Sequence, residues 1–145
     1  MIGIAQFGIA LGALGAVLAF MGLFPGVTGI EPGIGVGIVQ YVTIFTGFTL
    51  LDLGALIYVK YTFYPDRPAN FAQQIGIRLT MTGLLLGGMA GLADFLGFGS
   101  HIRTDVTDVV FGPLQAIGAV GGLVVAAIGI IIYALTGEPP AEGDE

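Results

Sequence analysis

The sequence predicts an all-α membrane protein, a four-transmembrane-helix bundle built from two tandem helical hairpins of the same orientation. Of its 145 residues, 55% are hydrophobic and only 10% are charged, which leaves too little polar surface to cover a soluble globule. The two halves of the chain also align with each other. Four apolar stretches reach the length of about 20 residues that a helix needs to cross a bilayer: Ile2–Phe24, Ile34–Val59, Gly76–Phe98 and Val109–Leu135.

The first predicted helix, Ile2–Phe24, carries one stripe of small residues. At 100° per residue they fall within about 80° of one another: Gly8, Gly12, Gly15, Ala19, Gly22 and Gly26. Pro25 ends the helix, and the connection that follows contains Pro32 and no Lys or Arg. Because the segment lacks a basic N-terminal region and a small-x-small cleavage site, we expect a retained helix rather than a signal peptide.

The second predicted helix, Ile34–Val59, has two different polar faces. One face spans about 60° and holds Gln40, Thr43, Gly47, Gly54 and Tyr58. Asp52 lies about 120° around the helix from Gln40, among aromatic residues. In the connection 60–70 aromatic and basic residues are mixed, which is typical of a membrane interface.

The third predicted helix, Gly76–Phe98, follows Asn70 and Gln73, which have the spacing of a capping pair. Arg78 lies on the side of this helix opposite its small residues. The face with small and polar residues consists of Gly76, Thr80, Gly83, Gly87, Ala90, Gly91 and Asp94.

The fourth predicted helix, Val109–Leu135, follows Thr107 and Asp108, either of which has the right chemistry for its N-cap. Its small and polar face consists of Gln115, Gly118, Gly122, Ala126, Gly129 and Tyr133. We expect residues 1–136 to form one transmembrane domain. Residues 137–145 are acidic and proline-containing, which predicts a disordered tail.

An internal repeat with an offset of 75 residues relates the two halves of the chain, about residues 1–60 and about residues 76–135. Each repeat contains two helices, so both hairpins would have one orientation about an axis along the membrane normal. The intramembrane charges belong to one copy only. The identical pairs are Gly8 with Gly83, Leu11 with Leu86, Gly12 with Gly87, Phe20 with Phe95, Gly22 with Gly97, Gly37 with Gly112, Gln40 with Gln115, Gly47 with Gly122, Gly54 with Gly129, Ile57 with Ile132 and Tyr58 with Tyr133.

The basic residues predict how the protein is oriented. Lys60, Arg67 and Arg78 flank the connection between the second and third helices, whereas the other two connections contain only Arg103. Cytoplasmic connections carry the excess of Lys and Arg. We therefore expect a multi-pass protein of the cell membrane with both termini in the cytoplasm.

The glycine stripes predict close helix contacts, because small residues let two backbones approach within a bilayer. A pathway lined by glycine is the alternative. The candidate packing residues are Gly8, Gly12, Gly83, Gly87, Gly91, Gly118 and Gly122. Gln40 and Gln115 match in the repeat, and we expect them to bond across the bundle axis, to each other or to backbone carbonyls. A contact with a substrate is the less favoured interpretation of the two glutamines.

Asp52 is the sharpest candidate for chemistry, because an ionisable side chain inside a bilayer is costly unless it is paired or protonated. One interpretation is an ion pair with Arg78 at similar depth. In another, Arg78 extends to the lipid headgroups unaided. In the third, Asp52 couples the movement of a proton or a cation.

At the outer end, Asp94 is expected to pair with Arg103 or His101. Catalysis and a cofactor are not expected, because no catalytic triad, phosphate-binding loop or metalloprotease motif is present. A divalent cation site is not expected either, since one histidine without ligand spacing gives no support for it. The residues that such a site would use are Glu31, His101, Asp105 and Asp108.

These observations favour a non-enzymatic integral membrane protein that works by association, either with itself or as a small subunit of a membrane complex. The lipid bilayer is its expected environment. The net charge of −6 argues against nucleic acid as a partner and against adhesion to anionic lipid headgroups. The alternative function is a small proton- or cation-coupled transporter or channel that uses Asp52.

Overall fold

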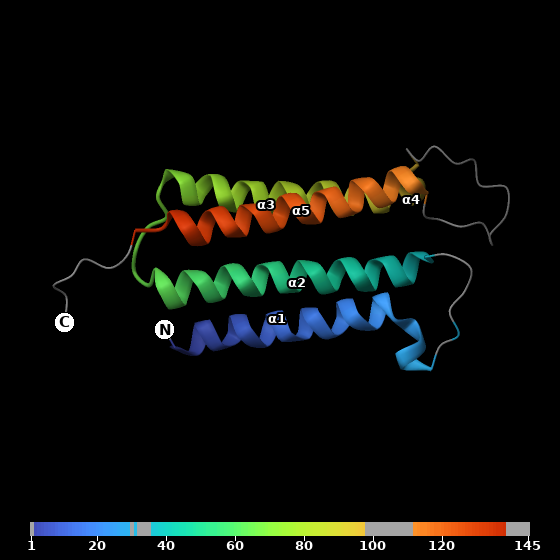
Figure 1. The fold of residues 1–145 in the computed structure, drawn as a ribbon, viewed down its shortest axis with the longest axis horizontal. Coiled ribbons are helices and arrows are strands. Elements are labelled where there is room, and N and C mark those ends of the chain that lie inside the picture. Colours follow the sequence, from blue (N-terminus) through green and yellow to red (C-terminus); the bar gives the residue numbers. More distant parts are fainter. Residues whose placement is uncertain (1, 30, 32–35, 98–111, 139–145) are drawn as a thin grey trace.

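The computed structural model describes residues 2–29, 31, 36–97 and 112–138. Every secondary-structure element in this part of the chain is a helix. In chain order the elements are α1 (Ile2–Leu23), the 3-10 helix η1 (Pro25–Thr28), α2 (Ile38–Phe63), α3 (Phe71–Gly91), α4 (Ala93–Leu96) and α5 (Pro113–Thr136). Figure 1 shows α1, α2, α3 and α5 lying side by side as long parallel or antiparallel rods.

Three of these helices are long and apolar enough to cross a membrane: α1 over Gly3–Leu23, α2 and α5. The expected all-helical architecture, with apolar helices of membrane-spanning length, is confirmed for the described residues. α3 has 21 residues and runs along α5, but Gln73, Gln74 and Arg78 lower its hydropathy. Its membrane crossing remains a prediction.

Several predicted helix boundaries were wrong by a few residues. α1 ends at Leu23, one residue early. α2 begins at Ile38 instead of Ile34 and continues past Val59 to Phe63, because no proline interrupts the helix before Pro65. α5 begins at Pro113, at the first helical position, where the missing N–H of proline costs nothing. Residues 109–111, where the fourth helix was predicted to begin, lie outside the described residues.

The third helix differs most from its prediction. It begins at Phe71, where the predicted capping pair is confirmed: Gln73 N donates to Asn70 Oδ1 at 2.8 Å, and Asn70 N donates to Gln73 Oε1 at 3.2 Å. α3 then ends at Gly91 rather than Phe98. Leu92 has φ −98° and ψ 8°, outside the α-helical range, and separates α3 from the single turn of α4.

The first hairpin, α1 with α2, is held together by backbone contacts at glycine. On α2, Gly47 faces the carbonyl oxygen of Gly15 and the amide of Ala19, and Gly54 faces the same groups of Gly8 and Gly12. A Cβ added at Gly54 would lie 2.5 Å from Gly12 N, so only glycine fits there. The contacts at Gly8 and Gly12, two of the candidate packing residues, are therefore made inside one hairpin.

The second hairpin, α3 with α5, repeats this arrangement. Gly122 on α5 faces the carbonyl oxygen of Gly83 and the amide of Gly87, at 2.5 Å from an added Cβ in each case. Two turns later, Gly129 faces the corresponding groups of Gly76 and Thr80.

The two hairpins correspond at two different sequence offsets. Gly47 and Gly122 are equivalent in packing and differ by 75, whereas Gly15 and Gly83, their partners, differ by 68. The reason is the connection within each hairpin: residues 24–37 make 14 in the first, and residues 92–112 make 21 in the second, seven more. A single ungapped offset of 75 does not describe the packing of α1 and α3.

The sequence agrees with the offset of 68 for the first helix of each hairpin. Over residues 3–23 it gives seven identities, against five for α1 at the offset of 75. The seven pairs are Gln6 with Gln74, Gly8 with Gly76, Ile9 with Ile77, Leu11 with Leu79, Gly15 with Gly83, Leu18 with Leu86 and Met21 with Met89.

Candidate functional site at the hairpin interface

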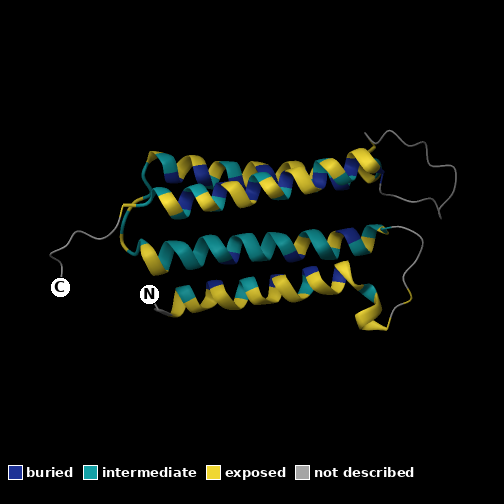
Figure 2. Cartoon of the chain, viewed as in Figure 1, coloured by how far each residue is buried: buried dark blue, intermediate teal, exposed yellow. Residues whose placement is uncertain are grey.

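The two hairpins meet along α2, which lies between α1 and the α3–α5 pair (Figure 1). Most of α2 is therefore partly buried along its length, whereas α1 has one largely exposed side (Figure 2). Near the start of α2, the Tyr41 hydroxyl donates a hydrogen bond of 2.6 Å to Gly87 O, and the Tyr41 ring lies on Gly91. Phe45 stacks on Tyr41, with ring centroids 5.7 Å apart, and packs against Gly88. We call these interactions the Tyr41 contact.

A second contact joins the hairpins at the other end. The Tyr64 hydroxyl donates to Ala134 O at 2.5 Å, and its ring lies on Gly137. Asn70 Nδ2 donates to Thr136 O at 2.6 Å. This Tyr64 contact ties the connection between the hairpins to the end of α5.

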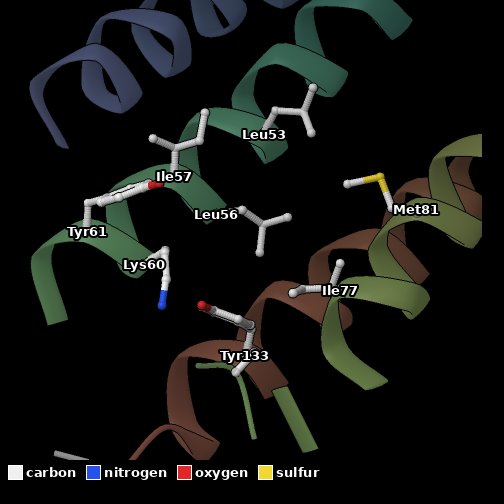
Figure 3. Close-up of a pocket in the computed structure, with 9 residues that line it drawn as sticks. Leu53, Leu56, Ile57, Lys60, Tyr61, Ile77, Met81 and Tyr133 are labelled. Atoms are coloured by element: carbon white, nitrogen blue, oxygen red, sulfur yellow. The ribbon is translucent and has the colours of Figure 1, made fainter. Parts of the chain in front are cut away.

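Between these two contacts lies a groove with a volume of about 340 Å³ (Figure 3). Its lining is mostly apolar, and Lys60 and Tyr133 form a polar end, whereas the Tyr61 oxygen lies beside Ile57 (Figure 3). A volume of about 300–1,000 Å³ is typical of ligand pockets. The complete lining is Leu53, Leu56, Ile57, Lys60, Tyr61, Ala69, Ile77, Met81 and Tyr133.

The polar end of the groove consists of hydrogen-bond donors. The Lys60 ammonium donates to the carbonyl oxygen of Arg67, which uses one of its three N–H groups. Tyr133 is only 3% exposed, and its hydroxyl makes no hydrogen bond within the described part of the chain. Figure 3 shows the Tyr133 oxygen and the Lys60 nitrogen directed toward one another.

Asp52 lies on the face of α2 that is turned toward the second hairpin. At 100° per residue it is about 20° from Tyr41 on one side and about 20° from Phe45 on the other. It is half-buried, whereas Arg78 is exposed on α3. No ion pair joins Asp52 and Arg78, both of which the structure describes. The structure thus does not bring this predicted pair together, and a coupling role of Asp52 stays a prediction.

The two matched glutamines bond to backbone within their own hairpins. Gln40 Nε2 donates to Gly22 O at 2.8 Å, a backbone carbonyl of α1 in the same hairpin and not one across the bundle axis. Gln115 is buried, and its Oε1 accepts from Gly112 N at 2.5 Å at the start of α5. Its Nε2 is buried without a partner among the described residues. Neither glutamine bonds to the other.

At the opposite end from the groove, the Asp94 Oδ1 atom is buried without a partner among the described residues. Its predicted partners Arg103 and His101, together with Asp105 and Asp108, lie outside those residues. Glu31 is exposed. Within the described part of the chain, no three histidine or acidic residues form a group able to hold a metal ion.

The remaining predicted packing residues fall in two places. Gly8 and Gly12 contact α2 and Gly83 and Gly87 contact α5, as described above. Gly91 instead receives the Tyr41 ring, and Gly118 faces the side chain of Ala90; neither was assigned these partners from the sequence.

Sequence reasoning did not identify the groove or the tyrosines around it. One sequence pattern pointed to the α2 side of the groove. Lys60 and Tyr61 follow Leu53 and Leu56 at helical spacing, which places hydrogen-bond donors at the end of an apolar stripe. The sequence alone did not show that α3 and α5 form the wall of the groove that faces α2.

Comparison of the chain with protein-family models, curated proteins and solved structures finds no match. The described fold is all-helical, and three of its helices are long and apolar enough to cross a membrane, which is compatible with a small membrane protein. Any more particular function must be argued from the geometry of the hairpins and their interface.

Proposed function

We propose that this chain is a four-span integral membrane protein that acts by association, with itself or as an accessory subunit of a membrane complex, and not by catalysis. α3 supplies the fourth span: its 21 residues extend about 32 Å, the thickness of a bilayer core, and it follows α5 along its length. The repeated glycine contacts support a tandem-hairpin origin for the bundle.

The observation that carries this proposal is the outward surface of the helices. Large apolar side chains are exposed along α1 and α5, on faces that no part of the described chain covers (Figure 2). These faces suit lipid or the apolar face of another transmembrane helix. On α1 they include Phe7, Leu14, Val17 and Phe20, and on α5 Ile117, Val120, Val124 and Ile131.

The polar side chains of the helices support the same proposal. Gln40, Tyr41 and Thr80 donate to carbonyl oxygens of their own chain, so they hold the fold together instead of lining a path. By the excess of bases at Lys60, Arg67 and Arg78, the connection between the hairpins and both termini lie in the cytoplasm, and the protein belongs to the cell membrane.

Energy transfer between labelled copies in vesicles tests self-association. Self-association gives transfer that rises with the protein-to-lipid ratio and falls when unlabelled protein is added. An accessory subunit gives instead one partner that cross-links to it in native membranes at a fixed stoichiometry. The absence of both results would overturn the proposal.

A second candidate function, proton- or cation-coupled transport, is favoured by one observation: Asp52 is half-buried between the hairpins and forms no ion pair with any residue that the structure describes. Reconstituted vesicles distinguish the candidates. Transport predicts a cation or proton flux that Asp52→Asn abolishes in a folded protein, because the amide cannot titrate. No flux in the wild-type protein would exclude this candidate.

A further inference from the structure

The groove between the hairpins has the shape and chemistry of a site for an amphiphile. From Lys60 its α2 wall extends back to Leu53, seven residues and about 10 Å along the helix. Leu56, Ile77 and Met81 make the body apolar. A ligand here would place a hydrocarbon chain against these side chains and a polar group at the Lys60 end.

The charge of the polar end selects an anion. None of the residues that line the groove is acidic, whereas Lys60 retains free N–H donors after its bond to Arg67. The acidic residues at this end of the described chain, Asp66 and Glu138, are exposed and do not line the groove. A protein with a net charge of −6 therefore has a locally cationic pocket.

A second and independent observation points to a ligand. The Tyr133 side chain is 3% exposed as a whole, but its hydroxyl oxygen is not itself buried and makes no hydrogen bond within the described chain, so it is available to a ligand in the groove. That hydroxyl lines the groove and is directed toward Lys60 (Figure 3). An acceptor oxygen between the two groups would satisfy both.

The depth of the site identifies the source of the amphiphile. Lys60 lies three residues, about 5 Å, before the end of α2 at Phe63. In the membrane arrangement of the proposed function, on which this inference rests, that end of α2 reaches the depth of the lipid headgroups. We infer that the groove binds one anionic membrane lipid, with an acyl chain between the hairpins and its phosphate or carboxylate held by Lys60 and Tyr133. Both donors act on the same headgroup oxygens.

Native mass spectrometry of the full-length protein tests this site, after equilibration with equal amounts of phosphatidylglycerol and phosphatidylcholine of identical acyl chains. The wild-type protein should retain one phosphatidylglycerol preferentially. Lys60→Gln should lower the ratio of retained anionic to neutral lipid about tenfold, since it removes a charge-assisted bond. Tyr133→Phe should lower it about threefold.

Two matched controls separate the groove from general attraction to anionic lipid. Arg78→Gln removes one positive charge from an exposed position on α3, outside the groove. Tyr58→Phe removes the hydroxyl of the tyrosine that matches Tyr133 in the repeat but does not line the groove. Both should leave the ratio unchanged. An equal loss in Lys60→Gln and Arg78→Gln would overturn the inference.

A steric test examines the acyl chain. Leu56→Trp fills the body of the groove and should abolish retention of both lipids, whereas Leu85→Trp, on an exposed position of α3, should not. Should Leu56→Trp lose its helical circular dichroism, Met81→Phe fills the same space from α3. Retention by folded groove-filled variants would overturn the inference, as would displacement of the lipid by soluble glycerol phosphate, which carries the headgroup chemistry without a chain.

Discussion

At the scale of single residues, glycine decides where the helices of each hairpin meet. A side chain at Gly122 would meet the backbone of Gly83 and Gly87, so its absence is what allows the two helices to approach. Leu85, by contrast, is 63% exposed and contacts lipid in the proposed membrane arrangement.

We therefore predict that Gly122→Leu is far more damaging than Leu85→Ala. The larger residue must separate α3 from α5, at a cost of about 1–3 kcal/mol or more, whereas the truncation should change stability by less than about 0.5 kcal/mol. Unfolding in a denaturing detergent, followed by circular dichroism, measures both. Equal tolerance would show that the glycine does not lie in a contact.

The Tyr41 hydroxyl provides a second residue-scale prediction. Tyr41→Phe keeps the ring on Gly91 but removes the hydrogen bond to Gly87 O, and should cost about 0.6–1 kcal/mol. Thr43→Val, which loses only a bond to Val39 O within α2, is the matched control. A smaller loss for Tyr41→Phe than for the control would show that the hydroxyl does not join the hairpins.

A third prediction concerns whether Asp52 and Arg78 interact, as measured by their coupling free energy. Because no ion pair joins them, the effects of Asp52→Asn and Arg78→Gln on stability should add within about 0.3–0.5 kcal/mol. A double-mutant cycle measures this. Recovery of stability in the double variant would show instead that the two charges pair in the membrane.

At the scale of elements, the register of the second hairpin follows from its longer connection. The structure places Thr80 against Ala126, whose carbonyl accepts from Thr80 Oγ1 at 3.1 Å. In the first hairpin Gly15 contacts Leu51. An offset of 75 would make Ala90 the equivalent of Gly15 and Ala126 the equivalent of Leu51, and would therefore place Ala90 opposite Ala126.

Cysteine cross-linking distinguishes the two registers, and the chain has no cysteine of its own to interfere. Thr80→Cys with Ala126→Cys should cross-link through a short thiol reagent. Ala90→Cys with Ala126→Cys should not, because in the structure Ala90 is displaced along α3 by about two turns, roughly 10 Å, from the residue that contacts Ala126. The reverse result would restore the uniform offset.

The sequence predicted where the helices lie in the chain better than how they pack against one another. Apolar length was enough to find four helices, and the capping chemistry of Asn70 and Gln73 was local enough to predict correctly. The end of α3 at Gly91 was missed because the apolar run continues past it through Phe95 and Leu96 without a breaking residue. Because glycines recur at similar spacing in α1 and α3, these two helices align with each other at an offset of 68 and also at an offset of 75.

The candidate site was predictable only in part, for a related reason. Helical periodicity placed Asp52 apart from the glycine face of α2, but it carries no information on which helix lies opposite. Depth alone suggested Arg78 as a partner, whereas α3 is rotated so that Arg78 is exposed and Ile77 and Met81 line the groove. The groove depends on three helices at once.

At the scale of the whole molecule, orientation is open to a direct test. A reporter fused after Glu145 should be cytoplasmic and one inserted at Gly29 should be external, because basic residues flank the connection between the hairpins. A cytoplasmic signal from Gly29 would reverse the orientation and move the groove to the opposite leaflet.

The separation of tight contacts within hairpins from sparse contacts between them has a consequence for assembly. Each hairpin can enter the membrane as its own unit, and the link between them, Pro65–Ala69, then has only to keep the two units near each other. Severing the chain there should therefore be tolerated. Residues 1–66 and 67–145, produced as two separate polypeptides, should recombine into one particle through the Tyr41 and Tyr64 contacts. Tyr41→Phe should lower the recombined fraction in a way that depends on protein concentration, because the tether no longer supplies a high local concentration.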